Sequence, residues 1–169
     1  MIELAASAKT YGRGARARLQ ETEDLGREGA RAALETIYRA LNSADLDLLE
    51  AVWLDHPLVQ LDNPVGGLLR GRAAVTALYS GLFTGRRRGW VELEALVEIW
   101  TPANVVFVGR ERGEYVTADQ AIPLVIRTTR CVSYVASAGG WRLVHDHGSF
   151  DDPALLARYQ AATGVPRVS

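Results

Sequence analysis

The chain has 169 residues, of which 48% are hydrophobic and 23% charged, and its 19 Lys and Arg residues nearly balance 20 Asp and Glu residues. This length favours one domain, and the near-zero net charge argues against a nucleic-acid partner, which needs a concentrated positive surface. The single Cys131 excludes an intramolecular disulfide and a Cys-rich zinc site. No apolar run reaches the roughly 18 residues that cross a membrane, and the first residues lack the pattern of a secretory signal. We therefore expect a cytoplasmic protein with no membrane partner.

Residues 1–27 predict an N-terminal arm or extension. Residues 11–18, YGRGARAR, are rich in Gly and Arg, and residues 20–28 are mostly charged. Such a segment has too little apolar surface to offset the entropy that is lost when it becomes ordered. Its three arginines are accompanied by one aromatic residue, Tyr11, and acidic residues follow at once. We expect a solvated or partner-packing arm rather than one that binds RNA.

Three helices are predicted in the first half of the chain. Apolar residues recur at spacings of three and four over residues 29–42, which predicts an amphipathic helix with one buried face. A short second helix is predicted at residues 46–53, behind a capping Ser or Asp, and a third after Gly71. Between them, residues 58–61 predict a short strand that runs into the turn-forming sequence DNPVGG at residues 62–67.

From residue 91 onward the apolar period changes from 3.6 to 2, which indicates strands. The predicted strands are residues 91–99, 105–116, 122–135 and 141–150, followed by a helix over residues 154–162. The first strand is expected to have one buried face, formed by Val91, Leu93, Ala95, Val97 and Ile99. Helices followed by an antiparallel meander, without the βαβ alternation of a parallel sheet, define the α+β class.

Three stretches carry a resemblance to a known family. They are ALNSADLD at residues 40–47 with Trp53 after it, LRGRAAV at residues 69–75, and GWRLVHDHGS at residues 140–149. In this order and on these element types, they resemble landmarks of the nuclear-transport-factor-2-like superfamily, particularly its SnoaL-like and ketosteroid-isomerase-like members. We place this domain at residues 28–162, between the arm and a C-terminal tail at residues 163–169.

The resemblance implies an α+β fold in which a curved antiparallel sheet wraps N-terminal helices into a cone. About four long strands and some short edge strands would form this sheet. The resemblance also implies an internal small-molecule pocket and a homodimer through the outer face of the sheet. It implies no particular reaction, because scaffolds of this kind serve several enzyme classes and non-catalytic domains.

The parts of a ketosteroid isomerase are changed in this chain. The family has an Asp base directly before Pro-Val-Gly, whereas here Asn63 takes that place and Asp62 lies one residue earlier. A shift of one residue along a strand turns a side chain to the other face. At the position of the family's oxyanion tyrosine the chain has Ile37, with Tyr38 next to it, and residues 131–133 hold no second acid. We therefore do not expect steroid isomerisation.

Two histidines lie on the last predicted strand. If Trp141 pairs with Val135 across the intervening turn, the antiparallel register predicts the pairs Leu143 with Ser133, His145 with Cys131, His147 with Thr129, and Ser149 with Arg127. Directly opposed residues share a face of the sheet, and Trp141 and Leu143 favour the core for this face. We therefore predict that His145 and His147 project into the pocket together with their partners.

An inward imidazole close to Asp62 is suited to acid–base chemistry, because the pKa of a histidine lies near neutrality. We predict His147 as the proton-transfer residue and Asp62 as its orienting partner or as the base itself. The predicted substrate-binding residues are Asn63, Arg127, Thr129, His145, Tyr38 and Trp53. A purely structural polar network is an equal alternative. No metal is expected, because two histidines and one distant carboxylate make a weak ligand set.

Two other polar features are assigned structural roles. Arg110 and Arg112 alternate with Glu111 and Glu114, which predicts an ion-paired outer face or a dimer interface rather than a site. Cys131 lies in an apolar strand, so we expect a small buried side chain and not a nucleophile.

Three functions remain open from the sequence. We favour a small pocket enzyme of the isomerase, cyclase, hydratase or lyase type, which acts on a small apolar metabolite by acid–base chemistry without a cofactor. The alternatives are a non-catalytic protein that binds a small ligand in the same pocket and a dimerising scaffold whose pocket is filled. An open cavity with His147 directed into it would favour the enzyme.

Overall fold

The computed structural model describes residues 1–65, 67–85 and 88–164. The elements, in chain order, are β1 (Glu3–Ser7), the 3-10 helix η1 (Leu19–Glu23), α1 (Arg27–Ser43), α2 (Leu46–Val52), β2 (Gln60–Asn63), β3 (Gly67–Arg70), α3 (Arg72–Gly85), β4 (Arg88–Trp100), β5 (Asn104–Val116), β6 (Ala121–Val135), the 3-10 helix η2 (Ala136–Ala138), β7 (Gly140–Phe150) and α4 (Pro153–Thr163). The predicted tail at residues 163–169 lies outside the described residues except for its first two. None of the described helices combines the length and the apolar character needed to cross a membrane.

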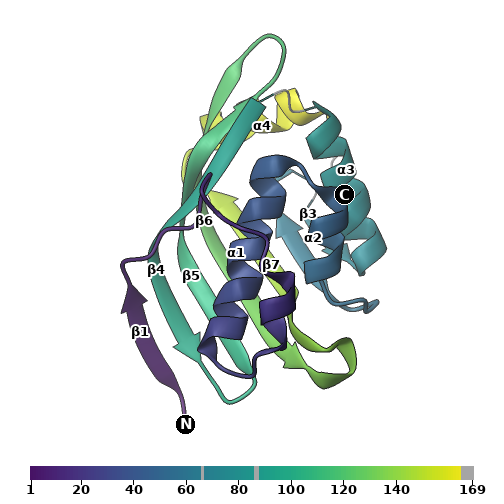
Figure 1. The fold of residues 1–169 in the computed structure, drawn as a ribbon. Helices are drawn as coiled ribbons and strands as arrows, with labels where there is room; N and C mark the ends of the chain where they lie inside the picture. Colours follow the sequence, from purple (N-terminus) through teal and green to yellow (C-terminus); the bar gives the residue numbers. More distant parts are fainter. Residues whose placement is uncertain (66, 86–87, 165–169) are drawn as a thin grey trace.

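A seven-stranded sheet runs through the molecule in the order β1-β4-β5-β6-β7-β2-β3. Its neighbouring strands are antiparallel except for β2 and β7, which are parallel. The sheet curves around α1, while α2 and α3 lie to one side and α4 lies at one end (Figure 1). The predicted α+β class is confirmed, and so is the meander of four long strands, which are β4 to β7.

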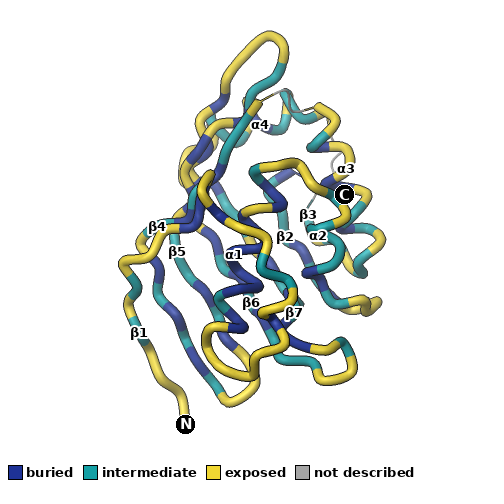
Figure 2. Tube along the Cα trace, in the orientation of Figure 1, coloured by how far each residue is buried: buried dark blue, intermediate teal, exposed yellow. Residues whose placement is uncertain are grey.

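Helix α1 is enclosed on more than one face, unlike the predicted amphipathic helix. The predicted apolar stripe, which includes Leu34 and Tyr38, is buried. Glu35 and Thr36, on other sides of the helix, are buried as well, and α1 is largely dark blue in Figure 2. The sheet covers only one side of this helix, so a further segment of the chain must cover the rest.

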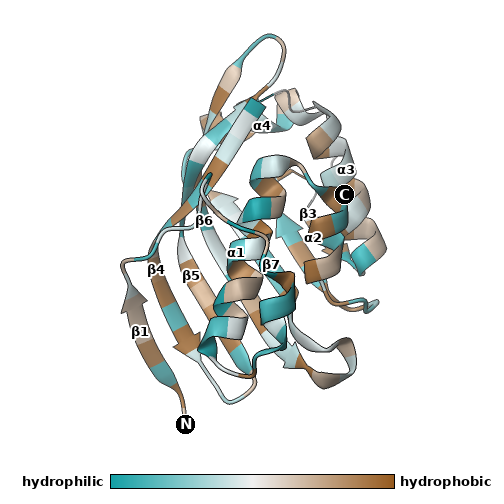
Figure 3. Ribbon diagram, in the orientation of Figure 1, coloured by the Kyte–Doolittle hydropathy of each residue, from teal (hydrophilic) through white to brown (hydrophobic). Residues whose placement is uncertain are grey.

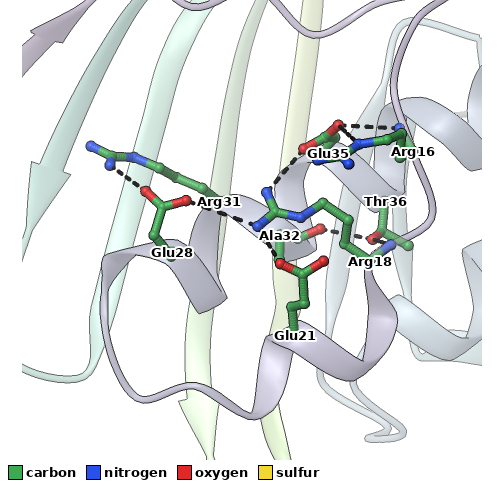
Figure 4. Close-up of polar contacts among 8 residues, drawn as sticks. All are labelled: Arg16, Arg18, Glu21, Glu28, Arg31, Ala32, Glu35 and Thr36. Atoms are coloured by element: carbon green, nitrogen blue, oxygen red, sulfur yellow. Dashed lines mark hydrogen bonds and ion pairs between the residues drawn. The ribbon is translucent and has the colours of Figure 1, made fainter.

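Part of that cover is the N-terminal segment, which packs onto the domain through buried residues such as Tyr11 and Thr22, while β1 stays largely exposed. Strand β1 pairs with β4 at the edge of the sheet, and the buried ring of Tyr11 stacks on Tyr38 with 6.3 Å between the ring centroids. Nη1 of Arg18 donates to Oε2 of Glu35 at 3.0 Å, and its backbone N–H donates to the hydroxyl of Thr36 at 2.9 Å (Figure 4). The sequence does not predict these contacts, because the few apolar residues of the segment show no period.

We expect Tyr11→Ala to lower the free energy of unfolding by about 3 kcal/mol, because it empties a buried site beside α1. Thr10→Ala is the matched control, since Thr10 is exposed and its substitution should change stability by less than about 0.5 kcal/mol. Urea unfolding followed by tryptophan fluorescence measures both changes. Equal effects of the two substitutions would show that the segment adds nothing to the core.

Strand β4 contains a bulge that reverses its two faces. Between two successive pairs with β5 the strand carries one extra residue, and Ala95 in this stretch has a φ of 52°. Beyond the bulge the buried residues are Leu96, Glu98 and Trp100. The alternation of hydrophobic and hydrophilic residues along β4 and β5 is visible in Figure 3. The prediction of one buried face along residues 91–99 is therefore wrong after Leu93, because an extra residue turns the following side chains over.

Candidate active site

A cavity of about 90 Å³ lies between the inner face of the sheet, the end of α1, and helices α3 and α4. Its wall is mostly apolar and aromatic and includes Leu82, Phe83, Val91, Tyr115, Leu124 and Tyr159. Polar groups on the wall come from Asn63, Glu111, Thr128, Arg130 and Asp146. A concave apolar surface with a few convergent polar groups is typical of small-molecule sites.

Four buried polar side chains meet beside the cavity. Nη1 of Arg130 donates to Oδ2 of Asp146 at 2.6 Å, and Nη2 donates to Oε1 of Glu111 at 2.5 Å. Nε of Arg130 donates to the hydroxyl of Tyr38 at 3.2 Å, and this hydroxyl donates to the same oxygen of Glu111 at 2.5 Å. We refer to these four residues as the Arg130 cluster. They come from β6, β7, β5 and α1, so the cluster joins the helix to three strands.

The Arg130 cluster has two carboxyl groups for one guanidinium. The three charged side chains are only 3–7% exposed, and buried charges are costly unless they are balanced. Burial raises the pKa of Asp146 to about 6, although Arg130 opposes this change, and Glu111 raises it further. A carboxyl group with this pKa gains and loses its proton near neutral pH, as a general acid or base must.

Each carboxyl group of the cluster has one oxygen without a partner among the described residues. The hydrogen bonds from Arg130 and Tyr38 go to Oδ2 of Asp146 and Oε1 of Glu111. Within the residues that the structure describes, Oδ1 of Asp146 and Oε2 of Glu111 accept no hydrogen bond, and both residues line the cavity. The hydroxyl of Tyr79 on the cavity wall is also unpaired within this part of the chain, and its residue is 7% exposed.

The raised pKa of Asp146 predicts a stability that depends on pH. The folded chain holds this proton more tightly than the unfolded chain, so the contribution to stability is complete below about pH 4 and is lost as the pH rises through about 6. The free energy of unfolding of the wild type, relative to Asp146→Asn, should therefore increase by about 1 kcal/mol from pH 8 to pH 5. Urea unfolding at the two pH values measures this. A constant difference would mean that Asp146 titrates in its usual range.

The two predicted catalytic residues lie on the outer face of the sheet. The side chains of His147 and Asp62 are 46% and 48% exposed, and Nε2 of His147 lies 4.0 Å from Oδ2 of Asp62. The two are neighbours, as expected, but neither lines the cavity. The prediction that His147 faces inward is therefore wrong. The catalytic roles of His147 and Asp62 stay predictions, but these roles were predicted for side chains inside the cavity, and neither side chain lies there.

A bulge in β7 explains why the histidines face outward. The pairs predicted for His145 and His147 with residues of β6 are found. Leu143, by contrast, pairs one residue away from its predicted partner, which leaves Val144 as an extra residue in β7. Because a bulge turns the following side chains over, the buried side of β7 passes from Leu143 to Asp146.

Three of the six predicted substrate-binding residues lie on the inner side of the sheet. Asn63 lines the cavity at the end of β2, where its Oδ1 accepts a backbone N–H two residues further on at 2.8 Å. Tyr38 is fully buried and reaches the site through its hydrogen bonds within the Arg130 cluster. Trp53 is buried in the core and is not part of the cavity wall, so its prediction as a ligand contact is wrong.

The other three predicted substrate-binding residues lie on the outer face. Arg127 is 62% exposed, and its Nε lies 2.6 Å from Oδ1 of Asp151. Thr129 pairs with His147, and both border a shallow depression on the outer face. His145 is partly buried, and burial, followed by the charge of His147, lowers its pKa. The prediction that these three side chains project into the pocket is wrong, because they share the face that the β7 bulge turns outward.

Sequence reasoning did not find the Arg130 cluster. Glu111 is predicted on an ion-paired outer face, but its neighbour Arg112 pairs with two Glu residues of β4 on that face while Glu111 points inward. The signal that could have found it is a charged residue at an inward position of each of two adjacent strands, here Glu111 and Arg130. Among the described residues, no group of three or more His, Cys, Asp or Glu side chains could hold a metal ion.

A curved sheet around one long helix, with an enclosed polar cluster, defines a cone-shaped α+β protein with an internal site. The profile of the SnoaL-like domain matches residues 30–153. The chain therefore belongs to the SnoaL-like domain family. The resemblance seen in its motifs is thus confirmed. Among proteins of curated function, none matches this chain.

Solved structures show the same fold with differing assignments. A nuclear-transport-factor-2-like superfamily protein from Salmonella enterica has a TM-score of 0.66 and 18% identity, over 74% of this chain and 89% of that one. A protein from Streptomyces avermitilis, provisionally named a dehydratase, has a TM-score of 0.64 and 18% identity, over 72% and 93%. A protein from Thiobacillus denitrificans, provisionally named a calcium/calmodulin-dependent protein kinase type II association domain, has a TM-score of 0.61 and 30% identity, over 70% and 92%. Such likeness shows the fold and not a reaction.

Proposed function

We propose that this protein is a cofactor-independent acid–base enzyme for a small, largely apolar molecule, with Asp146 as the residue that exchanges a proton with the substrate. The observation that carries the proposal is the state of Asp146. Its carboxyl group is buried, has a pKa of about 6, lies beside a cavity, and has one oxygen that accepts no hydrogen bond from the residues that the structure describes. These are the properties that a general acid or base needs. The proposal includes no cofactor and keeps the cytoplasmic location that the sequence predicts.

The neighbours of Asp146 support this chemistry in different ways. Arg130 holds Oδ2 of Asp146 and thereby orients Oδ1. Glu111, held by Arg130 and Tyr38, adds a second carboxylate oxygen at the cavity. The wall of the cavity is mostly apolar, and such surroundings strengthen electrostatic interactions inside the site. Such groups can move a proton within one substrate, in isomerisation or in the gain and loss of water. The provisional dehydratase name of the Streptomyces avermitilis protein denotes a reaction of this kind.

A deuterium-exchange assay tests the proposal without knowledge of the substrate. The protein is incubated in D₂O with small ketones, alcohols and unsaturated compounds, and proton NMR follows the loss of their C–H signals. We expect the wild type to accelerate exchange in at least one class of compound, and heat-denatured protein to have no effect. If no class exchanges while native mass spectrometry detects a bound small molecule, the protein is a non-catalytic ligand-binding protein and the proposal fails.

We also propose that the chain forms a homodimer through the outer face of the sheet. One shallow depression on this face is lined by apolar and charged residues, among others Ala95, Val97, Val108, Arg110 and Arg127. Protein interfaces commonly combine apolar contacts with arginines in this way. A native mass of two chains at micromolar concentration is expected, and a mass of one chain under those conditions would overturn this proposal.

A further inference from the structure

We infer that the cavity selects a ligand with a positively charged ammonium group on a compact apolar body, held by the free carboxyl oxygens of Asp146 and Glu111. This inference rests on the proposed function, because it assigns a substrate class to the same site. Binding can be measured without turnover, so the two can fail separately. Three properties of the cavity support the inference of an ammonium ligand: its charge, its hydrogen-bonding groups and its size.

The Arg130 cluster has one more acidic side chain than basic side chains. When both carboxyl groups are ionised, the two negative charges of Glu111 and Asp146 and the one positive charge of Arg130 leave a net charge of −1 on side chains that are 3–7% exposed. Arg130 is the one Lys or Arg on the cavity wall within the described residues. An unbalanced buried charge is unfavourable, and a bound cation removes the imbalance. An ammonium group therefore gains interaction energy that a neutral group of the same shape does not.

An anionic ligand is disfavoured by the same arrangement. Each of the three nitrogen atoms of Arg130 already donates a hydrogen bond, to Asp146, to Glu111 or to Tyr38. A carboxylate or phosphate would have to compete with two carboxylates for this guanidinium, at a site whose net charge is already negative. The buried arginine is thus a structural partner of the two acids and not a receptor for an anion.

Three hydrogen-bond acceptors are available to an ammonium group, which has three N–H donors. They are Oδ1 of Asp146, Oε2 of Glu111 and the hydroxyl of Tyr79, each unpaired within the described residues. All three residues line the cavity and are at most 7% exposed. The ring of Tyr79 can add a cation–π interaction. Acceptors on three different elements, β7, β5 and α3, define a site that is built by the fold and not by one acidic stretch of sequence.

The volume of the cavity limits the body of the ligand. About 90 Å³ is less than the roughly 150 Å³ of a protein cavity that holds benzene. A ligand enclosed by this cavity therefore has fewer heavy atoms than benzene, and n-butylammonium is a suitable probe. Neutral 1-butanol has the same butyl body, and anionic butyrate has a propyl body one carbon shorter, so that the three probes differ mainly in the head group.

Isothermal titration calorimetry of the wild type with these three probes at pH 7.5 tests the inference. We expect n-butylammonium to bind at least about tenfold more tightly than 1-butanol, because it makes charge-assisted hydrogen bonds, and we expect no saturable binding of butyrate. Glu111→Gln and Asp146→Asn should each remove this preference and leave the affinity for 1-butanol unchanged. His147→Asn is the control on the outer face and should leave all three affinities unchanged.

Several results would overturn the inference. Equal affinities of the wild type for the amine and the alcohol, tighter binding of butyrate, or no binding of any probe would each contradict it. A preference that is lost in His147→Asn but kept in Glu111→Gln would place the cation at the outer His147–Asp62 pair. The comparison of the three probes on the wild type holds even if a variant does not fold. None of these results decides whether Asp146 transfers protons, which the deuterium exchange tests by itself.

Discussion

Asp146→Asn is expected to lower the rate of catalysed proton exchange by about 10²–10⁴-fold, the usual contribution of a positioned acid or base. An asparagine amide has nearly the shape of the carboxyl group, and its carbonyl oxygen can still accept the hydrogen bond from Nη1 of Arg130. The variant loses the exchangeable proton, and it also removes the excess negative charge of the cluster. The fold should therefore be kept, and deuterium exchange under the conditions of the wild type measures the loss.

The matched controls are His147→Asn and Asp62→Asn on the outer face of the sheet. Both should keep the exchange rate within about twofold of the wild type, since surface substitutions away from the site have small effects. The opposite pattern, in which His147→Asn loses the rate and Asp146→Asn keeps it, would show that the outer pair is the catalytic site. The roles first predicted for His147 and Asp62 would then be correct, and the assignment of Asp146 would be wrong.

Arg130→Met is expected to lower the free energy of unfolding by about 3–5 kcal/mol at pH 8. The substitution leaves the carboxyl groups of Glu111 and Asp146 buried without a cation, and it removes the donors that bind both of them. The loss should be smaller at pH 5, because protonation of a carboxyl group removes one of the unbalanced charges. Urea unfolding at the two pH values measures the effect.

A triple variant separates charge from packing in this experiment. Arg130→Met combined with Glu111→Gln and Asp146→Asn removes all three charges, and most of the lost stability should return, since apolar or neutral replacements of buried ion pairs are often tolerated. The control is Arg127→Met on the same strand, which is exposed and should cost less than about 0.5 kcal/mol. A loss for Arg130→Met no larger than that of the control would mean that the cluster is not a buried ionic network.

The architecture could be predicted from local patterns in the chain. Helix α1 and the strands β4 to β7 follow from apolar periods of 3.6 and 2, which depend on residues close together in sequence. The predicted pair of Trp141 with Val135 is wrong, because Trp141 pairs with Tyr134. His145 and His147 still pair as predicted with β6, because the extra Val144 offsets this difference of one residue. The packing of the N-terminal segment could not be predicted, because it depends on isolated contacts such as Tyr11 against Tyr38.

The residues that enter the cavity could not be predicted in the same way. Asn63 was found because it stands directly before Pro-Val-Gly, where the resemblance places a site residue. The histidine pair and Asp146 lie in the stretch His145-Asp146-His147, where every residue is polar and hydropathy does not show which of them is buried. Which of these three side chains is buried depends on which alternate positions of the strand face inward. Counting alternate residues from the buried Trp141 predicts that His145 and His147 face inward. This prediction is wrong, because the extra residue Val144 shifts the alternation by one position.

The chain by itself thus determined the class of fold and the order of the long strands, since these depend on periodic patterns within each segment, and its three motifs indicated the family by resemblance. Tertiary structure decided which polar side chains are enclosed. The bulges at Ala95 and Val144 shift the alternation of inward and outward side chains in β4 and β7, and the local apolar pattern does not show where such an extra residue is inserted. One inserted residue turns Asp146 towards Arg130 and His147 towards the outer face. The candidate site is therefore at Asp146, on the inner face of the sheet, and not at His147.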